Sequence, residues 1–121
     1  MRFRPEQHLR RQSDFRAVRE QGRRLNCGAF TLGCLRRESA PEPALLPRVG
    51  VVASTAAVGH AVLRNRAKRR LRAIFREHQG LLPAGCDVLL TARHAVTTWS
   101  FAELTQKFSD ACAQLSPRKP K

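Results

Sequence analysis

"GHAVLRNRAKRRLRAIFREHQG", residues 59–80, decides the fold, because it predicts a helix with one apolar and one basic side. At about 100° per residue, the apolar side chains fall in one stripe roughly 120° wide. This stripe contains Leu63, Ala67, Leu71, Ile74, Phe75 and His78. Such a stripe packs on a sheet, so we predict a long helix over residues 59–79 that ends at Gly80.

The opposite arc of this helix is basic. It carries Asn65, Arg66, Lys68, Arg69, Arg72 and Arg76. Only Glu77 offers a nearby opposite charge, and each pair of like charges three or four positions apart destabilises a helix by about 0.2–0.5 kcal/mol. A solvated charged face usually mixes both signs. This arc therefore predicts a polyanionic partner.

The composition of the chain supports the same interpretation. Its 121 residues include 23 Lys and Arg against 9 Asp and Glu, for a net charge of +14, with 42% hydrophobic residues. A chain this apolar can fold, which favours a basic domain over a disordered basic tail. Nucleic acid is the first candidate partner and an anionic membrane surface the second. Charge alone leaves open DNA or RNA, and single or double strands.

The remaining segments predict a small α+β protein. Its elements are a helix over 13–21, strand 24–35 with a break at its glycines, strand 48–54, helix 59–79, strand 86–93 and helix 100–115. Ser100 and Glu103 have the spacing of a helix capping box. The order α-β-β-β-α-β-α indicates a two-layer sandwich in a single domain of residues 1–121, with a disordered basic tail at 116–121.

Two further features bear on location and chemistry. No apolar segment follows the basic N-terminus, and no run approaches the roughly 20 residues of a membrane span, so we expect a cytoplasmic protein. The four cysteines form no C-x-x-C pair, and we expect them to remain thiols in the core without binding metal. They are Cys27, Cys34, Cys86 and Cys112.

The sequence resembles the bacterial ribonuclease P protein component. The family's signature helix has an Arg-Asn-Arg core, which stands here at residues 64–66 and is followed by the basic run. Three further blocks resemble the family in the same order: "LRRQSDFRAVREQGRR" at 9–24, "PRVGVV" at 47–52 and "DVLLTAR" at 87–93. The resemblance thus extends over residues 9–115.

The resemblance implies an accessory protein subunit of an endoribonuclease. In this family a catalytic RNA holds the active site and its Mg²⁺, and the complex removes the 5′ leader from precursor tRNA. The implied partners are ribonuclease P RNA and precursor tRNA, without a membrane or an obligate protein partner, and no tightly bound metal is expected on the protein. The implied fold has a left-handed β-α-β crossover and is similar to a domain of a small-subunit ribosomal protein.

The resemblance also implies two sets of site residues and no catalytic residue in the protein. The catalytic RNA would contact Arg64, Asn65, Arg66, Lys68, Arg69 and Arg72. The single-stranded leader would lie in a cleft formed by the outward face of the sheet with Phe15, Val18, Phe30 and Arg11. Unpaired bases can stack on aromatic side chains in such a cleft, although core packing explains Phe15 equally well.

The sequence departs from the family pattern at the leader cleft. Gly33 stands where many members have an aromatic residue in the central strand, and Ala56 and Ala57 stand where two lysines are expected. Other basic residues could supply the missing charge. The candidates are Arg10, Arg11, Arg23 and Arg24.

Two rival functions remain at this point. A nuclease that acts without RNA would need clustered histidines or carboxylates, whereas the four histidines, at positions 8, 60, 78 and 94, are scattered. A ribosomal or general RNA-binding protein would suit the charge, but the ordered family blocks argue against it. A DNA-binding protein is disfavoured because no helix-turn-helix pair is apparent.

Overall fold

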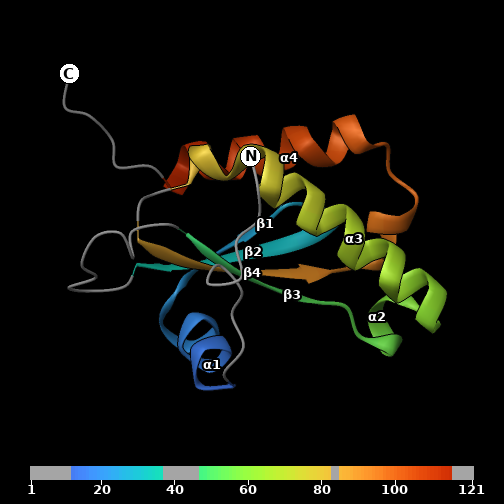
Figure 1. Cartoon of the computed structure of the whole chain (residues 1–121), viewed down its shortest axis with the longest axis horizontal. Coiled ribbons are helices and arrows are strands. Elements are labelled where there is room, and N and C mark those ends of the chain that lie inside the picture. Colours follow the sequence, from blue (N-terminus) through green and yellow to red (C-terminus); the bar gives the residue numbers. More distant parts are fainter. Residues whose placement is uncertain (1–11, 37–46, 83–84, 116–121) are drawn as a thin grey trace.

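The computed structural model describes residues 12–36, 47–82 and 85–115, and places helices on both faces of one four-stranded sheet (Figure 1). Helices α3 (Ala61–His78) and α4 (Phe101–Leu115) cover one face, and α1 (Gln12–Gln21) lies against the other. The strands are β1 (Arg23–Asn26), β2 (Phe30–Arg36), β3 (Arg48–Val52) and β4 (Cys86–Ala92). The predicted α+β class and element order are confirmed. The predicted tail at 116–121 lies outside the described residues.

The sheet has the strand order β1-β2-β4-β3. Strand β2 is antiparallel to both β1 and β4, whereas β3 and β4 are parallel neighbours. A parallel pair needs a crossover connection, which α3 supplies. This β3-α3-β4 crossover is left-handed (Figure 1), as the family resemblance implies and against the general preference for right-handed connections.

The core lies between the sheet and the α3–α4 layer. The apolar stripe of α3 is confirmed, because Ala67, Leu71, Ile74 and Phe75 are all fully buried. Alternate residues of β2 and β4 meet this stripe from the sheet. They are Phe30, Leu32, Val88, Leu90 and Ala92. The residues between them, such as Thr31, Leu89 and Thr91, therefore belong to the opposite face, on which α1 lies.

The connection between β1 and β2 shows why the predicted strand over 24–35 is broken. Gly28 has φ +80°, a conformation that favours glycine. A Cβ on Gly28 would also lie 2.6 Å from the Trp99 ring. The prediction of a break is confirmed at Gly28, whereas Gly33 lies within β2.

Three short helices were not predicted. Residues Thr55–Val58 form α2, capped by the Ser54 hydroxyl, which accepts a hydrogen bond from the Ala57 N–H at 3.1 Å. The prediction of one helix from residue 59 is therefore wrong at its start: Gly59, at φ +129°, separates α2 from α3. Residues His94–Thr97 form the 3₁₀ helix η3, and Gln79–Leu81 form η2 after α3.

Helix α4 begins as the capping box predicts. The Glu103 N–H donates to the Ser100 hydroxyl at 3.1 Å, and the Ser100 N–H donates to the Glu103 carboxylate at 3.3 Å. Both interactions satisfy backbone donors that the first turn of a helix leaves unpaired. The start of α4 is thus fixed by local sequence.

An ion pair fixes α1 and β3 relative to β4. Arg48 donates from Nε and Nη2 to the two carboxylate oxygens of Asp87, each at 2.8 Å. Its Nη2 also lies 3.8 Å from Asp14 Oδ1 in α1. The hydrogen bonds to Asp87 raise the pKa of Arg48. This network closes one end of the α1 face and leaves the other end of that face open for the groove described below.

Candidate nucleic-acid interface

The six residues assigned to the catalytic RNA all lie on α3, and four of them are exposed on the side that faces away from the sheet. We call this set, Arg64, Asn65, Arg66, Lys68, Arg69 and Arg72, the α3 basic surface. Asn65, Arg66, Arg69 and Arg72 are exposed. The exposure of these four residues is as the helical wheel predicts, whereas Arg64 was not among the residues that the wheel placed on this side. The contact of the six residues with RNA stays a prediction.

Arg64 and Lys68 lie at the border between this surface and the buried stripe. Both are only partly exposed, because at 100° per residue Arg64 falls between the buried Leu71 and Phe75, and Lys68 falls just beyond Phe75. The Nε atom of Arg64 is buried without a hydrogen-bond partner. An unsatisfied buried donor destabilises a folded chain.

Arg70 differs from its basic neighbours because it is bonded within the protein. Its Nη1 donates to the Val96 carbonyl and its Nη2 to the Trp99 carbonyl, both at 2.8 Å. Burial, and secondarily the charge of Arg66, lowers the pKa of Arg70. Arg70 therefore holds α3 against η3 and the turn that precedes α4.

A shallow groove runs along the open part of the other sheet face, beside α1. We call it the α1 groove. It is lined by Val18, Arg19, Arg24, Thr31, Gly33, Leu89 and Thr91. Two helix residues, one β1 residue and four residues of the central strands thus meet in one place, on the face where the leader cleft is predicted.

The residues predicted for the leader cleft have different outcomes. Val18 lines the α1 groove, although it is almost fully buried. Phe15 is half-buried on α1 and is absent from the described lining. The prediction for Phe30 is wrong, because Phe30 is 0% exposed in the core beneath α3 and α4, on the opposite sheet face. Arg11 lies outside the described residues.

The basic residues that could replace the two expected lysines lie in different places in the structure. Arg24 lines the α1 groove. Arg23 points to the other face, where its Nη1 donates to the Gln114 carbonyl of α4 at 2.9 Å. Ala56 and Ala57 are exposed on α2. Arg10 and Arg11 lie outside the described residues, so Arg24 is the candidate that the groove supports.

Sequence reasoning missed four residues of the groove: Arg19, Thr31, Leu89 and Thr91. The signal for the three strand residues was present, because each lies between two residues that point into the core. The alternation along β2 and β4 does not indicate which face of the sheet the helices leave open.

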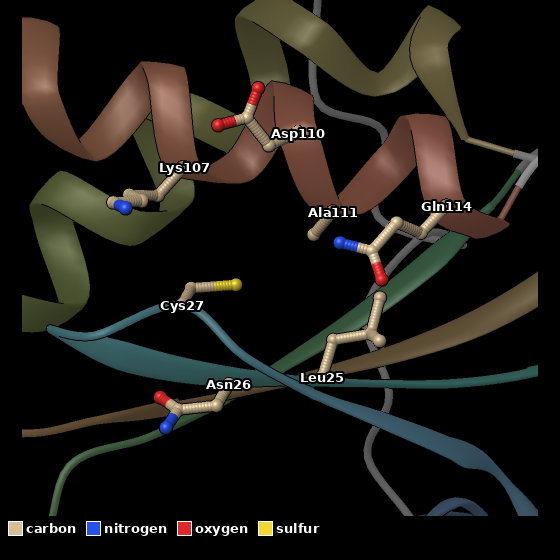
Figure 2. A pocket seen from close by; sticks show the side chains of 7 residues that line it. All are labelled: Leu25, Asn26, Cys27, Lys107, Asp110, Ala111 and Gln114. Carbon is tan, nitrogen blue, oxygen red and sulfur yellow. The ribbon is translucent and has the colours of Figure 1, made fainter.

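A larger cavity lies on the α4 side of β1 (Figure 2). Its volume is about 230 Å³, and it is lined by Leu25, Asn26, Cys27, Lys107, Asp110, Ala111 and Gln114. Figure 2 shows the Cys27 sulfur directed into the space below α4. Burial raises the pKa of Cys27 to about 11, so this thiol is protonated near neutral pH and is a poor nucleophile.

The described residues, 12–36, 47–82 and 85–115, lack both a cluster of metal ligands and a membrane-spanning helix. They contain no group of three or more His, Cys, Asp or Glu side chains placed to hold a metal ion. None of the helices they form is long and apolar enough to cross a membrane. All four cysteines are free thiols.

The left-handed crossover, the α3 basic surface and the α1 groove define a small basic α+β protein of the RNA-binding class. The profile described as ribonuclease P matches residues 3–116 of the 121-residue chain. The chain belongs to the ribonuclease P protein family.

Named relatives and solved structures agree with this assignment. The chain is 37% identical to the ribonuclease P protein component of Acidothermus cellulolyticus, over 92% of this chain and 89% of that protein. It is 37% identical to the corresponding Streptomyces avermitilis protein, over 91% of this chain and 92% of that protein. The fold resembles that of the Thermotoga maritima RNase P protein, with a TM-score of 0.75 and 24% sequence identity. The match covers 91% of this chain and 98% of that chain. These structural similarities confirm the predicted fold.

Proposed function

We propose that this chain is the protein subunit of a ribonuclease P, in which it binds the catalytic RNA and the 5′ leader of precursor tRNA. One observation carries the proposal: the exposed side of α3 gathers Asn65 and Arg66 of the family's Arg-Asn-Arg core with Arg69 and Arg72 of the basic run, while the other side of the helix is buried. The cationic side chains are thereby left to contact a polyanion. The family relationship supports ribonuclease P RNA as this polyanion.

The α3 basic surface contacts the catalytic RNA through its phosphates. Arginine suits this role because its planar guanidinium can donate two parallel hydrogen bonds to one phosphate. Arg66, Arg69 and Arg72 are exposed for such contacts, whereas Arg70 is occupied within the protein. The α1 groove, on the other side of the sheet, is left for the leader.

The active site belongs to the RNA subunit, which also holds most of the Mg²⁺. The protein's contribution is to bind the substrate leader and to neutralise phosphates, which lowers the need for free cations. Its basic residues therefore matter most at low Mg²⁺, where the RNA alone is poorly screened.

The test is cleavage of precursor tRNA at low Mg²⁺ by a bacterial ribonuclease P RNA, with and without the chain. Each component is also assayed alone. We expect the chain to be inactive alone and to restore cleavage by the RNA. Binding to the RNA without stimulation would contradict the proposal and favour a general RNA-binding protein, and cleavage by the repurified chain alone would favour a protein nuclease.

A further inference from the structure

Cys34 and Cys86 lie next to each other on the core side of the sheet. In the register of β2 and β4, Cys34 pairs with Val88 and Cys86 pairs with Arg36. The two cysteines are therefore diagonal neighbours. They share the alternation that directs Val88 into the core, so their side chains lie on the same face of the sheet. Their thiol groups form a hydrogen bond, and the fold thus brings together two reduced cysteines that are far apart in the sequence.

The two thiols differ in their access to solvent. Cys86 is 0% exposed, whereas Cys34 is partly exposed. The hydrogen bond with Cys86 is the main cause that lowers the pKa of Cys34. The charges of Arg36 and Arg23 lower this pKa further, whereas burial and the Asp87 carboxylate act in the opposite direction. Because oxidants react with the thiolate, Cys34 is the thiol of this pair that an oxidant in solution attacks first.

The other two cysteines are poor targets for an oxidant. Cys27 is 3% exposed and Cys112 is 1% exposed. Burial raises the pKa of Cys27 to about 11 and that of Cys112 to about 12. Both remain protonated near neutral pH and react slowly. The four cysteines thus comprise one accessible thiol, one buried neighbour that touches it, and two buried thiols of low reactivity.

The position of the pair at the ends of two strands allows a disulfide to close. Cys86 is the first residue of β4 and follows Gly85, and the pairing of β4 with β3 begins one residue later, at Asp87. Diagonal neighbours in an antiparallel pair have Cα atoms about 7–8 Å apart, whereas a disulfide spans about 4.4–6.8 Å. Closure therefore needs a shift of about 1 Å, which a strand end allows more readily than a strand centre. A disulfide that needs such a shift is easier to reduce than a relaxed one.

We infer that Cys34 and Cys86 form a reversible oxidation site, in which a hydroperoxide oxidises Cys34 and Cys86 then closes a disulfide with it. The Cys34 thiolate attacks one peroxide oxygen, the O–O bond breaks and hydroxide leaves, which gives a sulfenic acid at Cys34. The Cys86 sulfur attacks the sulfenic sulfur, the thiol proton goes to the departing oxygen and water leaves. The two thiols thereby give two electrons to the peroxide, and a dithiol reductant restores them by exchange.

The disulfide protects Cys34 from irreversible oxidation. A sulfenic acid that meets no second thiol is oxidised further to a sulfinic acid, which carries a charge and is not reduced by thiols. Such a charge at Cys34 would lie at the edge of the core and destabilise the fold. Because Cys86 is already in contact, ring closure precedes this second oxidation. The site needs no RNA, so the inference does not depend on the proposed function.

The test treats the 121-residue chain with hydrogen peroxide at neutral pH, blocks the remaining thiols with N-ethylmaleimide and maps tryptic peptides by mass spectrometry without reduction. We expect a cross-link between peptides 25–36 and 77–93 that dithiothreitol removes. Peptide 25–36 holds two cysteines, so the Cys27→Ala chain assigns the cross-link to Cys34. The absence of this cross-link, a cross-link to Cys112 instead, or a Cys34–Cys34 dimer would overturn the inference.

The Cys86→Ser variant tests the protective role. Its Cys34 sulfenic acid should be trapped by dimedone, and without dimedone the sulfinic acid at Cys34 should exceed that of the unmodified chain at least about tenfold. Cys112→Ser is the matched control, because it removes another buried core thiol and should leave both the cross-link and the low sulfinic acid level unchanged. Equal sulfinic acid in the unmodified chain and the Cys86→Ser variant would show that Cys86 does not protect Cys34.

Discussion

Gly22 joins α1 to β1 at a point where the backbones of α1 and β2 leave no room for a side chain. A Cβ there would lie 2.5 Å from the Val18 carbonyl oxygen and 2.8 Å from that of Cys34. Both are backbone atoms, so Gly22→Ala should destabilise the protein by about 1–3 kcal/mol, measured by urea unfolding. Gly80→Ala is the control: its Cβ would meet nothing within 4 Å, and no loss is expected. Equal unfolding midpoints for the Gly22→Ala and Gly80→Ala variants would contradict the claim that the backbone excludes a side chain at position 22.

The four thiols should differ in reactivity. Burial raises the pKa of Cys27 to about 11 and that of Cys112 to about 12, whereas a hydrogen bond with Cys86 lowers the pKa of the partly exposed Cys34. At pH 8 we expect iodoacetamide to modify Cys34 first, and Cys27 and Cys112 only after unfolding, as read by mass spectrometry. Native labelling of Cys27 as fast as Cys34 would disprove the burial argument.

The same two buried thiols affect stability at high pH. Their folded pKa values lie above the ordinary value of 9.0, so the fold favours the protonated thiols. Their contribution to stability is complete below about pH 9 and is lost as the pH rises through 11 and 12, because the unfolded thiols ionise first.

At the scale of the element, two adjacent arginines of α3 should have opposite phenotypes. Arg70→Ala removes the hydrogen bonds to Val96 and Trp99 and should destabilise the fold by about 1–3 kcal/mol, with a smaller effect on RNA affinity. Arg69→Ala, at an exposed position, should weaken RNA binding and leave the free energy of unfolding within about 0.5 kcal/mol. Each variant removes one positive charge, so unfolding and RNA titration compare them directly. A reversal of the two phenotypes would contradict the roles assigned to these residues.

The elements that sequence predicts well are those whose signal is local. The stripe through Ala67, Leu71 and Ile74 repeats with the helical period, and the Ser100–Glu103 box lies within one turn. Helix α2 has four residues, too few to show a period. Phe30 was assigned to the wrong face because alternation separates two faces of a strand without saying which one α1 leaves open. Which face stays open depends on where α1 packs, and this packing joins residues that are far apart in the sequence. The position of the groove and the role of Arg24 both follow from that packing.

At the scale of the whole molecule, part of the charge of +14 lies on two separate surfaces, the α3 basic surface and the α1 groove. They lie on opposite sides of the sheet, so one chain can contact the catalytic RNA and the leader at the same time. Variants in the two surfaces should therefore act independently, because distant sites with no shared partners are usually additive.

Salt dependence tests the role of the α3 basic surface at this scale. If the surface neutralises RNA phosphates, the logarithm of the binding constant should fall with the logarithm of salt concentration by about 0.7–0.9 per contact. Arg66→Ala/Arg69→Ala should flatten this slope by about twice that amount for ribonuclease P RNA, whereas Arg16→Ala/Arg36→Ala should leave it nearly unchanged. Filter binding over a series of salt concentrations measures all three slopes. An unchanged slope in the Arg66/Arg69 variant would show that the RNA binds elsewhere, because counterion release follows the phosphates that the protein contacts.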